Sequence, residues 1–211
     1  MNEPGREIEA KFHVQDLQAI RQRLLDLGAR QLKALHLERN WNFDTPDRRL
    51  QQGRQVLRLR VDGRVILTYK KQRQVFEERT EIELVLDNPE AARHMLEGLG
   101  FEMVLVYEKQ REVFEFRGLK VMLDEMPFGD FVEIEGPALE SLVEAAIKLN
   151  LVWEERASSS YLSMFEELRE RLKLPFHEAT FENFKRLPPE IREKIEWGVA
   201  DSKLAAPRRA S

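Results

Sequence analysis

Three Glu-Ile-Glu triplets occur in this chain, at Glu7–Glu9, Glu81–Glu83 and Glu133–Glu135. The first continues through Ala10 to Lys11, which places two carboxylates and an ammonium at a spacing of two. Successive side chains of a β-strand point to opposite faces, so these three charges would share one face of a strand. Such a face either borders water or lines a wet, charged cavity.

Basic residues are paired at the same spacing. Arg58 and Arg60 alternate with leucines, and Lys109 and Arg111 form a second pair. For any single strand, a solvated face of an antiparallel sheet is the simpler interpretation. The whole set is less ordinary, because each pair is chemically uniform, whereas a soluble surface usually mixes Lys, Glu, Gln, Thr and Ser.

The paired charges indicate a specific chemistry if the strands close into a barrel and share a lumen. Like charges repel strongly there unless a ligand compensates them. Acidic pairs favour divalent cations with oxygen ligands, Mg²⁺ or Mn²⁺. Basic pairs favour a polyanion, and the guanidinium fork suits phosphate. Together they predict a site for a metal-complexed polyphosphate, as phosphoryl or nucleotidyl transfer requires.

Segments in which apolar and polar residues alternate are predicted to form the strands that position these charges. Strands are predicted at residues 6–12, 35–43, 55–61, 65–71, 79–86, 120–126 and 130–135, with two further strands within 104–116. Helical periodicity and end signals predict helices at 16–28, 88–100, 139–149 and 158–174, with one or two short helices after them. The segments that begin at Glu7 and Glu81 can be overlaid as a weak internal repeat.

The ordered motifs resemble those of the CYTH superfamily, the triphosphate tunnel metalloenzymes. Glu7 to Lys11 is similar to that family's ExExK signature, and Ser160-Tyr161 resembles the motif that opens its C-terminal helix. Between them follow Leu57–Arg60, Leu67–Lys70, Glu81–Glu83, Lys109–Arg111, Leu123–Glu125 and Phe131–Glu135. The resemblance covers roughly residues 5–170, and it is greatest to the branch called class IV adenylyl cyclase.

This resemblance implies an α+β fold, with an eight-stranded antiparallel β-barrel that holds a triphosphate and one or two Mg²⁺ or Mn²⁺ ions. It implies that the metal ligands are Glu7, Glu9, Asp124, Glu133 and Glu135. It implies a substrate-binding set of Lys11, Arg58, Arg60, Lys70, Lys109 and Arg111, with Glu81 and Glu83 organising the basic side chains. Lys11 and Asp124 are the implied catalytic residues.

Three activities are compatible with the resemblance. The first is conversion of ATP to cyclic AMP and pyrophosphate, in which the ribose 3′-hydroxyl attacks the α-phosphorus. The second is hydrolysis of inorganic triphosphate, thiamine triphosphate or nucleoside triphosphates. The third is a non-catalytic polyphosphate or nucleotide sensor, which the intact metal carboxylates argue against. The motifs alone do not separate the first two, because both need the same charges.

Composition narrows the class of protein. The 211 residues suit one domain with an appendage, and we expect a tunnel domain at residues 1–174 and a helical appendage with a disordered tail at 175–211. Hydrophobic residues make up 42%, which is a globular composition. The net charge of −4 argues against a nucleic-acid partner. A homodimer is left open.

Other signals exclude some alternatives. The absence of cysteine excludes disulfides and thiolate metal sites. No GxxxxGK[ST] motif occurs, so a P-loop is excluded as the triphosphate binder. The four histidines lack ligand spacing and are expected in surface or packing roles. No apolar run has membrane-spanning length, and we expect a soluble cytoplasmic protein that binds no membrane.

Overall fold

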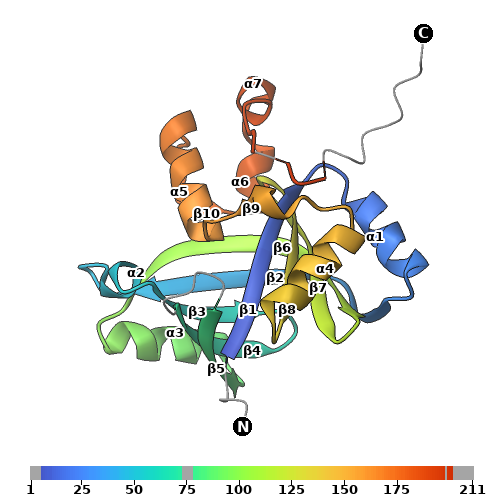
Figure 1. Ribbon diagram of the computed structural model, residues 1–211. Coiled ribbons are helices and arrows are strands. Elements are labelled where there is room, and N and C mark those ends of the chain that lie inside the picture. The colour runs from blue at the N-terminus through green and yellow to red at the C-terminus, as the bar shows by residue number, and fades with distance from the viewer. Residues whose placement is uncertain (1–5, 73–77, 198, 202–211) are drawn as a thin grey trace.

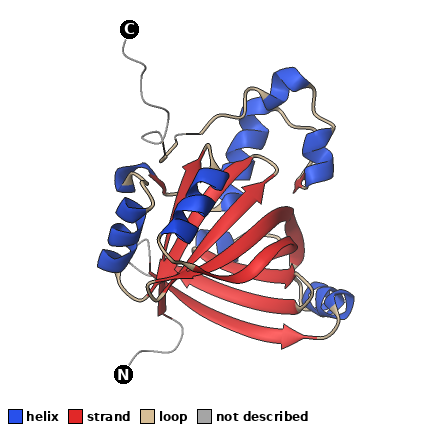
Figure 2. Ribbon diagram, turned by 90° about the vertical axis from the view of Figure 1, so that its right-hand side faces the viewer, coloured by secondary structure: helices blue, strands red, loops and turns tan. Residues whose placement is uncertain are grey.

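The computed structural model describes residues 6–72, 78–197 and 199–201, and one large sheet with flanking helices dominates it (Figure 1). Ten strands are described: β1 Arg6–Val14, β2 Arg30–Asp44, β3 Gln55–Val61, β4 Val65–Gln72, β5 Glu78–Leu86, β6 Glu102–Phe116, β7 Leu119–Met126, β8 Gly129–Gly136, β9 Arg156–Ala157 and β10 Glu178–Ala179. The sheet is strongly curved, as Figure 2 shows.

Backbone pairing orders the sheet as β10-β6-β2-β3-β4-β5-β1-β8-β7, and β7 also pairs with β6. Every pair among the eight long strands is antiparallel, while the two-residue β10 pairs parallel to β6 and β9 pairs with β1. The predicted antiparallel α+β fold is therefore confirmed. The predicted count of eight strands is exceeded, because the C-terminal third adds β9 and β10.

One strand prediction is wrong. Residues 104–116 were expected to contain two strands, but β6 is one strand of 15 residues that pairs with the equally long β2. The β2–β6 ladder contains three register shifts, between Gln31 and Lys33, Lys33 and His36, and Asn42 and Phe43. Such bulges increase local bend and twist, so a long pair can curve with the sheet without being broken.

The helices begin and end largely at the predicted residues. Among the described residues they are α1 Leu17–Asp26, α2 Arg49–Gln52, α3 Pro89–Gly98, α4 Leu139–Lys148, α5 Tyr161–Leu172, α6 Phe181–Lys185 and α7 Pro189–Arg192. Asp16, Asn88 and Ser160 cap α1, α3 and α5 by accepting from a backbone N–H three residues on. The short α2 was not predicted. No helix of the described residues is long and apolar enough to cross a membrane.

The apolar core lies outside the curved sheet, between the sheet and its helices. Ile8, Ala10 and Phe12 of β1 are buried there with residues of α1 and α4. Leu59 of β3 packs with Ala92 and Leu96 of α3. Because side chains alternate along a strand, burying these apolar residues outward turns the charged residues between them toward the concave side.

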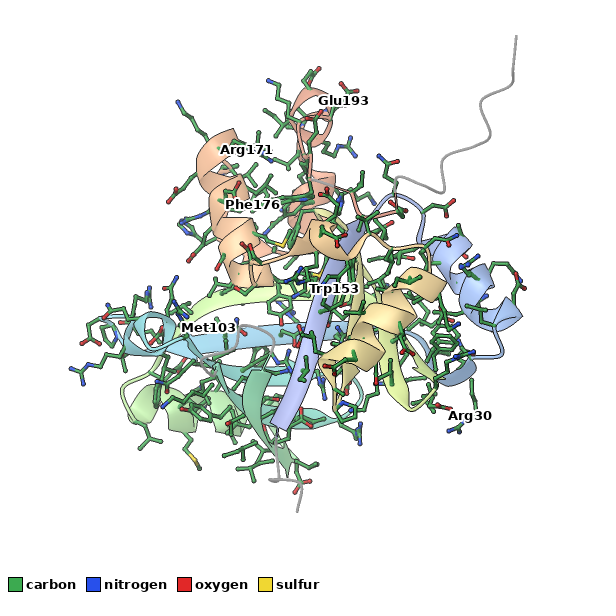
Figure 3. The ribbon with its side chains drawn as sticks, in the orientation of Figure 1. Arg30, Met103, Trp153, Arg171, Phe176 and Glu193 are labelled. Carbon is green, nitrogen blue, oxygen red and sulfur yellow. The ribbon has the colours of Figure 1, made fainter. Side chains whose placement is uncertain are left out.

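The segment after Leu174 is packed onto the domain. Phe184 is 3% exposed in a third cluster, with Phe165 of α5 and Phe128 of the β7–β8 turn. Figure 3 shows Phe176 next to α5, where it stacks on Phe165. The Asp201 carboxylate accepts from the backbone N–H of Gln15 at 2.9 Å. The tail predicted to be disordered, residues 205–211, lies outside the described residues.

Candidate active site

A charged cavity of about 370 Å³, partly open to solvent, lies on the concave side of the sheet. Nine basic and seven acidic side chains line it, together with Asn42, Tyr107, Tyr161 and a few others. The basic ones are Lys11, Lys33, Arg58, Arg60, Arg64, Lys70, Lys109, Arg111 and Lys120, and the acidic ones are Glu9, Glu38, Asp62, Glu81, Glu83, Glu133 and Glu135. A surface with so many charges persists facing inward only if water or an ionic ligand solvates it.

Most side chains predicted for the site meet at this cavity. Glu9 and Lys11, the two basic pairs, Lys70 and the second and third acidic pairs all line it. One predicted residue, Asp124, does not line it, because its side chain is fully buried beneath Lys109, Arg111 and Tyr161. The side chain of Glu7 lies outside what the structure describes.

Three of the seven acidic side chains, Glu9, Glu133 and Glu135, lie where β1 pairs with β8. The antiparallel register sets Glu9 directly opposite Glu135, and Lys11 opposite Glu133. Like charges directly opposite one another destabilise a strand pair. Two ammonium groups reduce the repulsion: Lys11 Nζ lies 3.0 Å from Glu133 and 3.7 Å from Glu9, and Lys120 Nζ lies 3.0 Å from Glu135.

Asp124 is the centre of a buried network. Its carboxylate accepts from Lys109 Nζ at 3.0 Å, from the Arg111 guanidinium in a two-pronged contact at 2.5 Å, and from the Tyr161 hydroxyl at 2.9 Å. Arg111 also pairs with Glu133. These bonds hold two cations of β6 in fixed positions, and they leave Asp124 at 0% exposure.

Electrostatics keep Glu133 and Arg111 of this network charged. Burial alone would raise the pKa of the Glu133 carboxyl, but the charges of Lys11 and Arg111 hold that pKa well below its ordinary value. Burial would lower the pKa of Arg111, yet Asp124 and Glu133 raise it well above its ordinary value. Burial and the charge of Asp124 both raise the pKa of the Tyr161 hydroxyl, which therefore remains a proton donor in the bond to Asp124.

Tyr161 also touches the first acidic strand. Lys11 Nζ lies 3.9 Å from the centre of the Tyr161 ring, a distance at which the ring face attracts the cation. The first residue of α5 thus joins β1 to the Asp124 network of β7.

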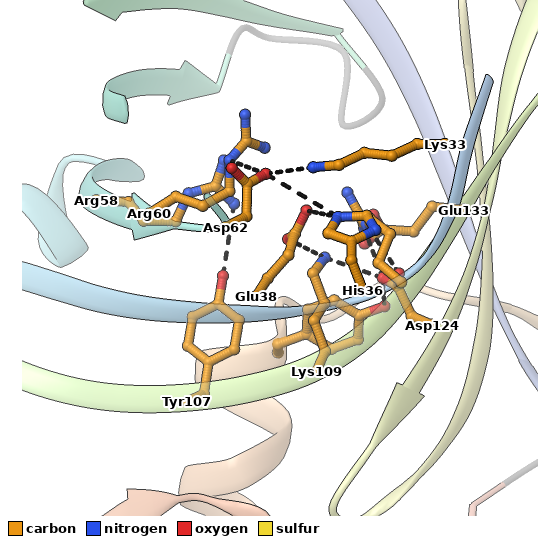
Figure 4. A network of polar contacts seen from close by, with 12 residues as sticks. Lys33, His36, Glu38, Arg58, Arg60, Asp62, Tyr107, Lys109, Asp124 and Glu133 are labelled. Atoms are coloured by element: carbon orange, nitrogen blue, oxygen red, sulfur yellow. Dashed lines mark hydrogen bonds and ion pairs between the residues drawn. The ribbon is translucent and has the colours of Figure 1, made fainter. Parts of the chain in front are cut away.

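A second polar network occupies the side formed by β2 and β3, and Figure 4 shows it. Glu38 is 2% exposed, with Lys109 Nζ at 3.7 Å and His36 Nε2 at 3.3 Å. Asp62 accepts from Lys33 at 2.9 Å and lies 3.7 Å from Arg60 Nε.

Three of these side chains form the one group with metal-ligand geometry within the described part of the chain: ligand atoms of His36, Glu38 and Asp62 lie within 4.8 Å of one another. Lys33, Arg60 and Lys109 already neutralise the two carboxylates, so the group is an ion-pair network. Burial would raise the pKa of Glu38, but the cations, Lys109 first, hold it well below its ordinary value. His36 therefore has a specific polar role, beyond the surface or packing role expected for it.

Arg58 lacks the close carboxylate partner that holds Lys11, Lys70, Lys109 and Arg111. Its guanidinium donates only a long hydrogen bond, 3.5 Å, to the Tyr107 hydroxyl, and its buried Nε has no hydrogen-bond partner. Burial would lower the pKa of Arg58, but Tyr107, Glu81 and Glu38 raise it above its ordinary value. Arg58 is therefore a charged side chain with donors available to an anion.

The sequence analysis missed several residues of the cavity wall: Lys33, Glu38, Asn42, Asp62, Arg64, Tyr107 and Lys120. It also missed the contacts of Tyr161 with Lys11 and Asp124. Some of them could be found from the alternation of side chains along a strand, because they share a strand face with predicted site residues. Tyr107 lies two residues before Lys109, and Lys120 lies four before Asp124 on the same face of β7. Lys33 carries no such signal, because it lies between two register shifts, one of which separates it from the regular part of β2.

The acidic donors fit a hard divalent cation. Glu9 and Glu135 offer carboxylate oxygens, the ligands that Mg²⁺ and Mn²⁺ prefer, on one face of two paired strands. A cation between them would also relieve the repulsion that their register imposes. Glu133 fits less well, since Lys11 and Arg111 already occupy its oxygens.

Several solved structures of other proteins have a similar fold. A candidate adenylate cyclase from Vibrio parahaemolyticus has a similar structure, with a TM-score of 0.70 and 22% identity over 78% of this chain and 99% of that chain. For the PH1012 protein from Pyrococcus horikoshii, the TM-score is 0.65 and the sequence identity is 26%, over 74% of this chain and 96% of that chain. HpAC1 from Hippeastrum is a candidate adenylyl cyclase with a dominant triphosphatase activity. Its TM-score is 0.56 and its sequence identity is 22%, over 76% of this chain and 95% of that chain.

No curated protein matches this chain. The model of the CYTH domain family matches residues 5–148, which is more than half of the sequence. That match spans all eight long strands and the acidic and basic pairs between them. The chain therefore belongs to the CYTH domain family.

Proposed function

We propose that this protein is a metal-dependent enzyme that binds a triphosphate in the charged cavity, and that it converts ATP to cyclic AMP and pyrophosphate as class IV adenylyl cyclases do. The circuit of eight long strands would act as a closed tunnel around the phosphates. One observation carries the proposal: nine cations and seven carboxylates line a single open cavity of about 370 Å³.

The charge balance of the wall supports both a polyanion and a metal. The cations exceed the carboxylates by two, which favours an anionic ligand but does not neutralise a triphosphate. Bound Mg²⁺ or Mn²⁺ would supply the missing positive charge and acidify an attacking hydroxyl or water. Glu9 and Glu135 are the proposed ligands together with Glu7, which completes the ExExK pattern.

The cations have two proposed roles. Arg58 and Arg60 bind phosphate oxygens directly, because Arg58 has unused donors and Arg60 faces the same cavity. Lys70 and Lys11 keep carboxylate partners, Glu81 at 2.6 Å and Glu133 at 3.0 Å, which position them for the phosphates. Charges fixed before the substrate arrives stabilise a developing charge without reorganising.

Asp124 is proposed as a positioning residue. The sequence resemblance gave it a metal or general-base role, but its oxygens lie behind the wall and already accept from Lys109, Arg111 and Tyr161. Through them it fixes two cations of β6 toward the cavity. Lys11 is the predicted catalytic residue whose side chain itself lines the cavity.

Hydrolysis is the second candidate. The same charges would hold inorganic triphosphate, thiamine triphosphate or a nucleoside triphosphate while water attacks a terminal phosphorus. HpAC1, which shares the fold, has a dominant triphosphatase activity. A non-catalytic sensor is the third candidate, and the intact carboxylate set disfavours it.

A substrate panel tests the proposal. ATP, other nucleoside triphosphates, thiamine triphosphate and tripolyphosphate are incubated with Mg²⁺ or Mn²⁺, and cyclic AMP, pyrophosphate and orthophosphate are resolved chromatographically. Cyclic AMP with equal pyrophosphate supports the cyclase. Orthophosphate without cyclic AMP, together with an equal amount of the diphosphate product (pyrophosphate from tripolyphosphate), supports the hydrolase. Undiminished turnover in excess chelator would refute metal dependence.

A further inference from the structure

A second cavity of about 270 Å³ adjoins the charged one, at the end where α2 and the start of α5 face each other. Asn42, Val56, Lys70, Ser160 and Leu162 line both cavities, so the two are continuous along this wall. Its volume is close to the lower end of the range for small-ligand sites, about 300 Å³. No residue after Ser163 lines either cavity among the described parts of the chain.

The walls of the second cavity differ chemically from the charged cavity. Apolar side chains supply much of the surface, including Phe43, Leu57 and Val104. Neutral hydrogen-bonding groups supply most of the rest: the amides of Asn42, Gln51 and Gln55 and the hydroxyls of Ser158, Ser159, Ser160 and Ser163. Asp44, Arg54 and Lys70 also line the cavity, but the Asp44 carboxylate accepts from backbone N–H groups of α2 and Lys70 pairs with Glu81. A largely apolar and neutral wall of this kind suits a flat organic group with several polar atoms better than a phosphate.

Asn42 gives the most direct sign of a ligand. Its side chain is 6% exposed, and its buried Oδ1 has no hydrogen-bond partner. An unpaired buried acceptor costs free energy unless a ligand or water pairs with it. Because Asn42 lines both cavities, this acceptor lies where a triphosphate in the first cavity would continue into the second.

Local structure keeps the second cavity open. Asp44 Oδ1 accepts from Leu50 N and Asp44 Oδ2 from Gln51 N, both at 2.9 Å, and these bonds fix α2 against β2. Arg48 and Arg54, on either side of α2, both adopt left-handed backbone conformations, with φ of 57° and 52°. Strained residues of this kind often occur at binding sites. Gln51 donates to Glu166 of α5 at 3.3 Å, which links the two walls.

We propose that the second cavity binds the nucleoside of a nucleoside triphosphate, with Asn42 Oδ1 accepting from a sugar hydroxyl and the apolar walls contacting the base. This proposal rests on the proposed function, since the charged cavity must hold the phosphates. It makes the substrate an organic triphosphate and gives inorganic triphosphate only part of the site.

Two variants test the site by binding, which is measured by calorimetric titration with ATP and with tripolyphosphate, each with Mg²⁺. Val104→Trp fills the second cavity from β6 and leaves the charged wall intact, because Val104 lines only the second cavity. We expect ATP to bind at least about tenfold more weakly and tripolyphosphate to bind within about twofold of wild type. Asn42→Ala should weaken ATP about threefold to tenfold.

Met103→Trp is the matched control. Met103 precedes Val104 on β6, is 41% exposed and lines neither cavity, so the same bulk is added outside the site. Both ligands should bind to this variant as they do to wild type.

The outcomes separate this inference from the proposed function. If wild type binds neither ligand, the proposed function fails and the nucleoside site fails with it. If wild type binds both ligands and Val104→Trp weakens neither or both equally, the nucleoside site is refuted while triphosphate binding stands. Selective loss of ATP in Val104→Trp, with none in Met103→Trp, supports the site.

Discussion

At the scale of single residues, the cations of the cavity differ in what already holds them. Arg111 is bound to Asp124 and Glu133, so its charge is largely used within the protein. Arg58 has only a long contact with Tyr107 and an unpaired Nε. Equal residue types on neighbouring strands therefore have different consequences when they are removed.

Arg58→Ala and Arg111→Ala should separate binding from stability. Arg58→Ala should weaken tripolyphosphate binding by about 1.5–3 kcal/mol while the melting temperature of the free protein changes little. Arg111→Ala should also lower the free energy of unfolding by about 3 kcal/mol, because it strips a buried partner from Asp124. Titration calorimetry and urea denaturation of both variants measure the two effects. Equal destabilisation would contradict the assignment.

Glu133→Gln and Glu135→Gln should differ in the same way. From the pairing of like charges alone, removing either carboxylate would be expected to relieve repulsion and leave the fold intact. The structure corrects this for Glu133, which is buried between Lys11 and Arg111. Glu133→Gln should cost about 3 kcal/mol of stability at neutral pH, whereas Glu135→Gln should stay within about 0.5 kcal/mol. Both should lower turnover by orders of magnitude.

The pH dependence checks the cause of that difference. The folded-state pKa of Glu133 is depressed, so its stabilisation is present above the unfolded pKa of about 4.3 and is lost as pH falls through the folded value. The stability gap between wild type and Glu133→Gln should shrink when denaturation is repeated below about pH 4. A gap independent of pH would assign the loss to packing.

At the scale of elements, the β7–β8 hairpin carries an acidic pair outside the cavity. Asp130 lies opposite Glu125, and burial, with the Glu125 charge second, raises the pKa of Asp130 to about 6. A raised carboxyl pKa means that stability is full below the unfolded value near 3.9 and is lost as pH rises through about 6.

Asp130→Asn should therefore stabilise the protein at neutral pH by about 1–2 kcal/mol, with the gain vanishing below about pH 4. Thermal unfolding across this pH range measures it. Glu125→Gln serves as the control and should give a smaller gain, because it removes only the second cause. A constant offset at every pH would show that the ionisation of Asp130 is not responsible.

The sequence predicts elements well where one period dominates. Strict alternation on β1, β3 and β8 gave both the strands and their charged faces, and caps such as Asn88 gave the helix starts. It failed where tertiary contacts decide. The four-residue α2 depends on the Asp44 carboxylate, and the bulged half of β2 has no regular period. The second cavity arises between elements far apart in the chain.

At the scale of the whole molecule, the described part of the C-terminal segment, residues 175–197 and 199–201, stabilises the domain and lines neither cavity. Phe184 and Leu187 are buried against α5, Trp197 Nε1 donates to the Phe128 carbonyl at 2.9 Å, and Ala200 N donates to the His13 carbonyl at 2.8 Å. These contacts do not support an influence of the described segment on the choice of substrate.

Phe184→Ala should lower the free energy of unfolding by about 3 kcal/mol or more, because it leaves a cavity among several aromatic rings. The ratio of ATP to tripolyphosphate affinity should stay unchanged. Lys185→Ala, at the exposed neighbouring position, is the control and should change neither quantity. A shifted affinity ratio in Phe184→Ala would give the C-terminal segment a part in specificity.

The central claim is that the charged cavity holds a triphosphate and its metal. A crystal structure with tripolyphosphate and Mn²⁺, with anomalous scattering to locate the metal, tests it most directly. We predict phosphate density against Arg58 and Arg60, and an anomalous peak beside Glu9 and Glu135. Tripolyphosphate bound only outside the cavity, or a cavity filled by water alone at saturating ligand, would contradict the account.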